Sequence, residues 1–121
     1  MTHTKFIEGL RDFVQKRPDT KYSKGNYRFC SYNKGKCTDG TQGCLFGQYV
    51  KSINPKQYQK YMDESGGGIG HLISEGMFGL DTQQPTNFVE WCDAVQQSQD
   101  RGNTWGEAIL EADKFYPLGK T

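Results

Sequence analysis

The chain has 121 residues, of which 34% are hydrophobic and 13% aromatic, and its formal net charge at pH 7 is +1. This length suits one domain over residues 1–121 with a modest core, to which each aromatic ring adds a large buried area. No apolar run approaches the length of about 18 residues that a membrane-spanning helix needs, so we expect no membrane partner.

The first predicted helix covers residues 6–14, where apolar side chains recur at the spacing of one helical face. Those side chains are Phe6, Ile7, Leu10, Phe13 and Val14. Thr2 or Thr4 is placed to cap the start of this helix, since threonine oxygens accept hydrogen bonds from the free amide groups there. Pro18 marks its end, because the residue before a proline is driven out of the helical conformation.

A turn-rich segment, residues 19–43, follows without a helical period, and glycines, asparagines and an aspartate punctuate it. Its central part, residues 27–37, alternates weakly between aromatic and polar side chains and then reaches the turn-forming Asn33-Lys34-Gly35. The pattern is equally consistent with a short β-hairpin and with an irregular loop, because an isolated hairpin has little stability of its own.

Two helices are predicted next, on either side of Asn54-Pro55. The first covers residues 43–53 with Thr41 as its cap, and Gly47 within it suggests close packing of this helix. Proline is favoured at the first position of a helix, so the second helix begins at Pro55 and ends before Ser65 and the three glycines that follow it.

Three shorter periodic segments complete the chain. A helix over residues 69–77 is expected to close at Gly79 in a left-handed conformation. Residues 88–95 show the next helical face, and the last helix starts with a capping box formed by Thr104 and Glu107. The inner side of that last helix is predicted to consist of Trp105, Ile109, Ala112 and either Phe115 or Tyr116.

Together these elements predict a mainly α fold, a compact bundle of five or six short helices with a glycine- and aromatic-rich loop or small β-hairpin near residues 22–42. Within that order, the segments GCLFGQYV and HLISEGMFGL resemble a loose group of small phage and bacterial proteins in which Cys-apolar-apolar-Gly begins a helix. The matching residues are Cys44, Leu45, Phe46 and Gly47, then Met77, Phe78, Gly79 and Leu80. The resemblance covers residues 25–116, and it implies an origin in a phage or another mobile element without assigning any chemistry.

Cys44 stands at the start of a predicted helix, where the helix dipole lowers the pKa of a thiol and favours the nucleophilic thiolate. A Cys–His hydrolase also needs a histidine within hydrogen-bond reach, and His71 is the candidate, since His3 lies near the chain terminus. No acid at a recognisable spacing orients such a pair, and free cysteine is commonly buried. We therefore expect no enzymatic activity, and a hydrolase built on Cys44 and His71 is the third hypothesis.

The four cysteines are expected to be free thiols in a reducing cytoplasm, because the start of the sequence lacks a secretory signal. Disulfides between Cys30 and Cys37 or between Cys37 and Cys44 are the alternatives. A structural zinc ion would combine these three cysteines with His71 or Cys92, but the regular seven-residue spacing is wider than the knuckles of about two to four residues in such sites. We expect no metal and no cofactor.

The near-neutral net charge conceals two segments of opposite sign. Residues 16–36 contain seven bases and the single acid Asp19, whereas residues 81–113 contain seven acids and the single base Arg101. Such segments attract each other within one fold or present differently charged faces to different partners. The basic segment has no counterpart in the group that the sequence resembles.

Aromatic residues alternate with bases in the basic segment, a combination that suits single-stranded nucleic acid, since cations neutralise phosphates and exposed rings stack on bases. The candidate binding residues are Lys21, Tyr22, Lys24, Tyr27, Arg28, Phe29, Tyr32 and Lys34. The favoured hypothesis is nevertheless a phage-type accessory protein in the host cytoplasm, which binds a host macromolecule without catalysis, because no catalytic constellation stands out. A host protein is the preferred partner, and nucleic acid is the alternative.

Overall fold

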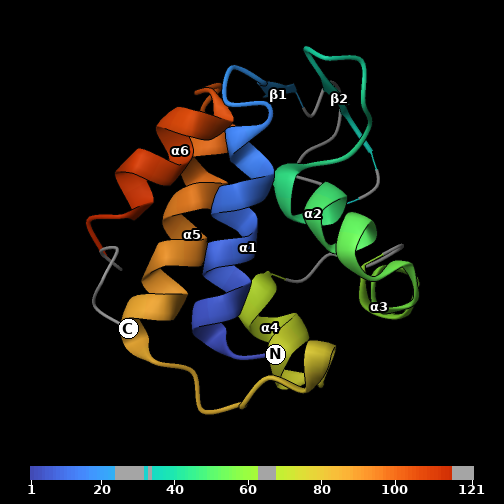
Figure 1. Cartoon of the computed structure of the whole chain (residues 1–121), viewed down its shortest axis with the longest axis vertical. Coiled ribbons are helices and arrows are strands. Elements are labelled where there is room, and N and C mark those ends of the chain that lie inside the picture. Colours follow the sequence, from blue (N-terminus) through green and yellow to red (C-terminus); the bar gives the residue numbers. More distant parts are fainter. Residues whose placement is uncertain (24–31, 33, 63–67, 116–121) are drawn as a thin grey trace.

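A computed structural model of the chain describes residues 1–23, 32, 34–62 and 68–115 (Figure 1). The described elements are α1 (His3–Gln15), β1 (Tyr22–Ser23), β2 (Lys36–Cys37), α2 (Leu45–Ile53), α3 (Pro55–Tyr61), α4 (Ile69–Ser74), the short 3-10 helix η1 (Met77–Gly79), α5 (Thr86–Asp100) and α6 (Trp105–Ala112). The fold is mainly helical with one small pair of strands, and the predicted fold class is therefore confirmed.

Helix α1 lies in the middle of the bundle, with α5 and α6 on one side and α2 on the other (Figure 1). Helix α4 lies beside the N-terminal end of α1, whereas the two strands lie at the opposite end. Helix α3 continues from α2 at the edge of the molecule. None of the described helices combines the length and the apolar character that crossing a membrane requires.

The core is rich in aromatic side chains, as the composition predicts, and Phe6 of α1 lies at its centre. The Phe6 ring centroid is 5.3 Å from that of Tyr49 and 5.9 Å from that of Phe88. The rings of Phe46 and Phe78 both lie 6.2 Å away. Aromatic pairs at these separations contribute beyond their buried area, so α1, α2, α5 and η1 are joined through one residue.

Several predicted helix starts are confirmed. The Thr2 hydroxyl accepts a hydrogen bond of 3.1 Å from the Lys5 amide, which selects Thr2 over Thr4 as the cap of α1. Asn54 caps α3, and Pro55 occupies the first helical turn. The capping box of α6 is complete: the Glu107 amide donates to the Thr104 hydroxyl, and the Thr104 amide donates to the Glu107 carboxylate.

The predicted cap of α2 is wrong. Helix α2 begins at Leu45 after Cys44, and the Leu45 amide donates a hydrogen bond of 2.7 Å to Oε1 of Gln99 in α5. Thr41 instead directs its hydroxyl to Asp39 Oδ1, at 2.5 Å. The acceptor for the helix start comes from a residue 54 positions away, so no local pattern could identify it.

The end of α4 also differs from the prediction. The helix ends at Ser74, and Gly76 follows it in the left-handed conformation with φ 110°; Gly79, the predicted residue, also has a positive φ of 64° but ends η1 instead. Gly76 is the first glycine after the helix and adopts this conformation without steric cost. Phe78 also has a positive φ, 59°, and its amide donates to Gln57 Oε1 of α3 at 2.7 Å.

Strands β1 and β2 are antiparallel, with Tyr22 opposite Cys37 and Ser23 opposite Lys36, so a small hairpin near residues 22–42 is confirmed. The predicted alternation over residues 27–37 lies largely outside the described residues. At the chain's last helix, α6 ends at Ala112 and Phe115 is 42% exposed, so Phe115, one of the two predicted alternatives, is not part of the inner side. Tyr116, the other candidate, lies outside the described residues.

Candidate binding site

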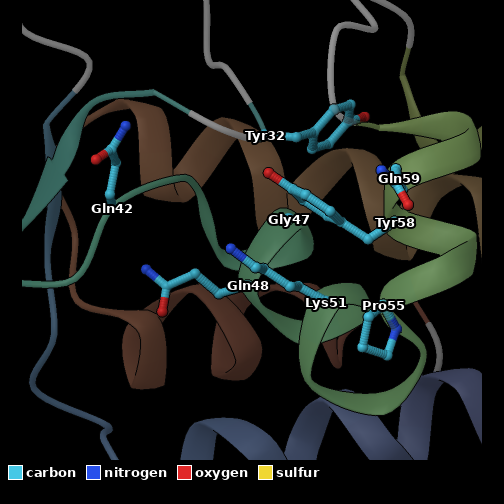
Figure 2. A pocket seen from close by; sticks show the side chains of 8 residues that line it. All are labelled: Tyr32, Gln42, Gly47, Gln48, Lys51, Pro55, Tyr58 and Gln59. Atoms are coloured by element: carbon cyan, nitrogen blue, oxygen red, sulfur yellow. The ribbon is translucent and has the colours of Figure 1, made fainter.

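An open pocket of about 510 Å³ lies where Tyr32, which precedes β2, and Gln42, in the loop after β2, meet α2 and α3 (Figure 2). We call it the α2–α3 pocket. Its described lining consists of Tyr32, Gln42, Gly47, Gln48, Lys51, Pro55, Tyr58 and Gln59. The volume is within the range of about 300 to 1,000 Å³ that is usual for ligand sites, and amides and aromatic rings dominate the lining.

The two helices supply matching faces to this pocket. Gly47 and Lys51 of α2 are one helical turn apart, as are Pro55 and Tyr58 of α3, and residues at that spacing share a face. Asn54 between the helices is extended, with φ −158° and ψ 90°, so the chain changes direction there. The two faces therefore meet around one concave surface.

Gly47 allows the backbone of Tyr32, which precedes β2, to lie directly on α2. A Cβ atom at this position would collide with the carbonyl group of Tyr32. The expected close packing at Gly47 is thus present, and its partner is the Tyr32 backbone. This contact holds Tyr32, which is only 4% exposed, as one wall of the pocket.

Lys51 lies along the ring of Tyr58. Figure 2 shows Tyr58 extending from α3 across the pocket with the Lys51 side chain beside it, and Lys51 Nζ is 5.4 Å from the ring centroid. The ring face attracts the ammonium group and restricts its position. No ion pair joins Lys51 to a carboxylate among the residues that the structure describes.

A hydrogen-bond network fixes the wall opposite α3. Gln48 Nε2 donates to Thr41 Oγ1 at 2.8 Å and to the Gly43 carbonyl at 3.0 Å, while Gln48 Oε1 accepts from Arg17 at 3.1 Å. Arg17 also donates to Asp39 Oδ2 at 2.6 Å. Burial opposes ionisation of Asp39, but hydrogen bonds from Thr41 and Arg17 outweigh it and lower its pKa. The wall is therefore held by an ionised carboxylate as well as by amides.

Charge is divided between the two sides of α1. Residues 34–62, which include β2, α2 and α3, contain five lysines and one acid, Asp39, which Arg17 neutralises. Helices α5 and α6, on the other side of α1 in Figure 1, contain Glu90, Asp93, Asp100, Glu107 and Glu111. Of the seven bases in residues 16–36, only Lys34 and Lys36 belong to this basic side. Lys21 instead lies near α6, where hydrogen bonds with Thr104 and, secondarily, the charge of Lys21 lower the pKa of Glu107.

A second pocket of about 360 Å³ lies on the acidic side, between α5 and α6. Its lining includes Glu90, Asp93 and the exposed pair of Arg101 and Glu111, whose Nη2–Oε1 distance is 3.1 Å. Burial raises the pKa of Asp93. The charged residues that line this pocket are mainly acids, whereas the charged residue of the described α2–α3 lining is Lys51. Residues of this second pocket therefore serve as control positions in experiments on the α2–α3 pocket.

The residues predicted to bind nucleic acid are placed as follows. Lys21 and Lys34 are exposed, whereas Tyr22 and Tyr32 are 5% and 4% exposed. The Tyr22 hydroxyl donates to the Lys34 carbonyl at 3.2 Å. These two rings therefore present little surface for stacking on bases, and of the eight candidates only Tyr32 is part of the described lining of the α2–α3 pocket. The remaining four, Lys24, Tyr27, Arg28 and Phe29, lie outside the described residues.

Cys44 and His71 do not form a reactive pair in this structure. Cys44 has no exposed surface at the start of α2, whereas the His71 side chain on α4 is 61% exposed and lies 2.5 Å from Glu75. The start of α2 is close to the strands, and α4 is at the other end of α1 (Figure 1). A thiol with no exposed surface cannot meet a substrate, so Cys44 fills space in the core.

The other two cysteines that the structure describes, Cys37 and Cys92, are also buried. Cys37, Cys44 and Cys92 are free thiols, so the alternative disulfide between Cys37 and Cys44 is absent. Burial raises the pKa of Cys37 and of Cys92, which disfavours the nucleophilic thiolate. Within the part of the chain that the structure describes, no three His, Cys, Asp or Glu side chains are grouped to hold a metal ion, and Cys30 lies outside that part.

The sequence analysis did not single out most of the pocket. It gave no binding role to Tyr58, Lys51 or the three glutamines. One signal could have found part of the site: the Asn54-Pro55 junction bends the chain between two short helices, so residues one turn before and after it face each other.

Comparisons of the chain with protein-family models, with curated proteins and with solved structures give no match.

Proposed function

We propose that the protein acts without catalysis as a small accessory protein that binds a host macromolecule, that its partner is a protein, and that the α2–α3 pocket is the binding site. The observation that carries this proposal is the open, amide- and tyrosine-lined pocket, whose walls are fixed by the contact of Gly47 with Tyr32 and by the Gln48 network. A pre-formed site of this kind reduces the ordering cost of binding.

The chemistry of the pocket favours binding over catalysis. Its described lining contains amides, tyrosines, a proline and one lysine, and these groups recognise a ligand without forming a nucleophile–base pair. Cys44, the candidate nucleophile, is buried away from solvent. The phage origin and the host partner rest on the resemblance of residues 44–47 and 77–80 alone.

A protein partner suits the pocket better than single-stranded nucleic acid does. Amide side chains offer one donor group and one acceptor group, the same pair that a peptide bond presents. Tyrosine is enriched among the residues that dominate protein interfaces. The rings of Tyr22 and Tyr32 are too buried to stack on bases. Nucleic-acid binding by residues 16–36 is the alternative function, because Lys21 and Lys34 in that segment are exposed.

Site-specific cross-linking in a bacterial lysate tests the proposal. One variant carries a photo-reactive amino acid at Gln59 in the pocket, and the matched control carries it at Gln97 in the acidic pocket; both positions are exposed. We expect a discrete protein adduct from position 59 and none from position 97. Equal labelling from both positions, no adduct at position 59, or an adduct that nuclease removes would contradict the proposal.

A further inference from the structure

We infer that the α2–α3 pocket takes an extended acidic segment of the protein partner, with one carboxylate of that segment bound by Lys51. This inference rests on the proposed function, because it names the chemistry of the partner at the same site. It depends on the charge of the pocket, on the geometry of Lys51 and Tyr58, and on the position of the glutamine amides.

The charge of the site selects an anionic ligand. Lys51 is the charged residue of the described lining, and no ion pair joins it to a carboxylate of the described chain. The surrounding elements add further lysines, and their acid Asp39 is neutralised by Arg17. An acidic ligand is therefore steered to this side of the molecule, and the acidic side formed by α5 and α6 repels it.

The geometry of Lys51 suits a single carboxylate. The Tyr58 ring faces the ammonium group at 5.4 Å from Nζ to the ring centroid, and Lys51 is exposed and part of the pocket lining. A carboxylate there forms a charge-assisted hydrogen bond and leaves the contact with the ring intact. The ammonium group is thus partly oriented before the ligand arrives.

The amides are placed for the backbone of an extended chain. Gln42 and Gln59 lie on opposite sides of the pocket in Figure 2, with the Lys51 ammonium between them. A peptide that crosses the pocket therefore meets an amide on each side and a cation in the middle. Nucleic acid fits less well, because it needs several phosphate-binding cations and exposed rings, whereas Tyr32 and Tyr58 are 4% and 9% exposed.

Fluorescence anisotropy with three labelled probes tests this inference: a short glutamate-rich peptide, the same peptide with glutamine in place of glutamate, and a single-stranded oligonucleotide of similar net charge. The proteins are wild type, Lys51→Gln and the matched control Lys56→Gln, which removes an exposed lysine of α3 that is not in the described pocket lining. We expect wild type to prefer the glutamate peptide over the glutamine peptide by about tenfold. Lys51→Gln should abolish that preference, and Lys56→Gln should retain it.

Equal affinity for the two peptides, or a preference that survives Lys51→Gln, overturns the inference. Stronger binding of the oligonucleotide, dependent on Lys51, overturns it in favour of nucleic acid. If wild type binds neither peptide while position 59 still cross-links a protein, the acidic-segment inference fails and the proposed function stands. If position 59 yields no protein adduct, the proposed function itself fails.

Discussion

The amide of Leu45 donates a hydrogen bond of 2.7 Å to Oε1 of Gln99, so a side chain of α5 caps the first turn of α2. Both groups are buried, and Gln99 has no exposed surface. This bond joins the helix that lines the α2–α3 pocket to the acidic side of the bundle. The position of the pocket therefore depends on a buried polar contact as well as on apolar packing.

Gln99→Met should lower the free energy of unfolding by about 1 to 3 kcal/mol, because it leaves the buried Leu45 amide without this acceptor. The matched control is Gln97→Met on the same helix, where the side chain is exposed and the change should stay within about 0.5 kcal/mol. Urea denaturation measures both values. Equal effects of the two substitutions would show that the cap contributes nothing.

Gly47→Ala should weaken peptide binding at the pocket, because the added Cβ displaces the Tyr32 backbone from α2. Alanine favours helices over glycine by up to about 1 kcal/mol, so the substitution would stabilise α2 if the loop were not there. Gly70→Ala in α4 is the matched control, since its Cβ would make only an ordinary contact of 3.5 Å with Gln84. We expect Gly70→Ala to raise the melting temperature with unchanged binding. A Gly47→Ala protein with wild-type affinity would contradict the role of this contact.

Asp113→Asn should destabilise the fold by about 3 kcal/mol, because it removes the carboxylate charge that is paired with the buried Arg11 guanidinium. Arg11 is 7% exposed, and its Nη2 lies 2.6 Å from Asp113 Oδ1, which also accepts from the Trp91 indole at 3.0 Å. Glu111→Gln breaks the exposed pair with Arg101 and should cost less than about 1 kcal/mol. Chemical denaturation of both variants checks the ranking, and a larger loss in Glu111→Gln would refute it.

Tyr49 should make the fold sensitive to alkali. Burial, and secondarily the charges of Asp12 and Cys92, raise the pKa of its hydroxyl, which donates to the Phe6 carbonyl at 2.9 Å. Above the ordinary tyrosine pKa of about 10, the unfolded chain ionises while the folded chain stays protonated, so stability falls by up to about 1.4 kcal/mol per pH unit. That contribution is fully present below pH 10 and is lost as the pH rises further.

The comparison is with Tyr49→Phe, which lacks the titrating group. At neutral pH this variant should be less stable by about 1 kcal/mol, because it lacks the hydrogen bond to Phe6. From about pH 10 upward, the stability difference between wild type and variant should shrink. Parallel stability curves across that range would contradict the assignment of the alkaline loss to Tyr49.

Local patterns predicted most of the helices. The apolar stripe of residues 6–14, Pro55 at a helix start and the Thr104–Glu107 box each act within a few residues, so the sequence alone reveals them. The end of α4 was misplaced because two glycines, Gly76 and Gly79, both suit a left-handed conformation, and both adopt it. Only packing decides which of them ends the helix.

The pocket was not predicted, because it depends on contacts between distant segments. The Leu45–Gln99 cap spans 54 residues, and the Tyr32 wall depends on the absence of a side chain at Gly47. Lys51 is the charged residue of α2 and belongs to no sequence motif. A binding role for it can be inferred only from the structure, which places it beside the Tyr58 ring. The acidic segment of the sequence does include α5 and α6, but the basic side of the fold is formed mainly by lysines that follow the predicted basic segment, among them Lys51, Lys56 and Lys60.

Backbone amide chemical shifts during titration with the glutamate-rich peptide test the central claim most directly, because they locate the bound ligand on the folded chain. We predict that the largest changes occur at Gln42, Gly47, Lys51 and Gln59, and that the amides of α5 and α6 change little. Saturating shifts centred on α5 and α6, or no shifts at the four pocket positions, would contradict binding at the α2–α3 pocket.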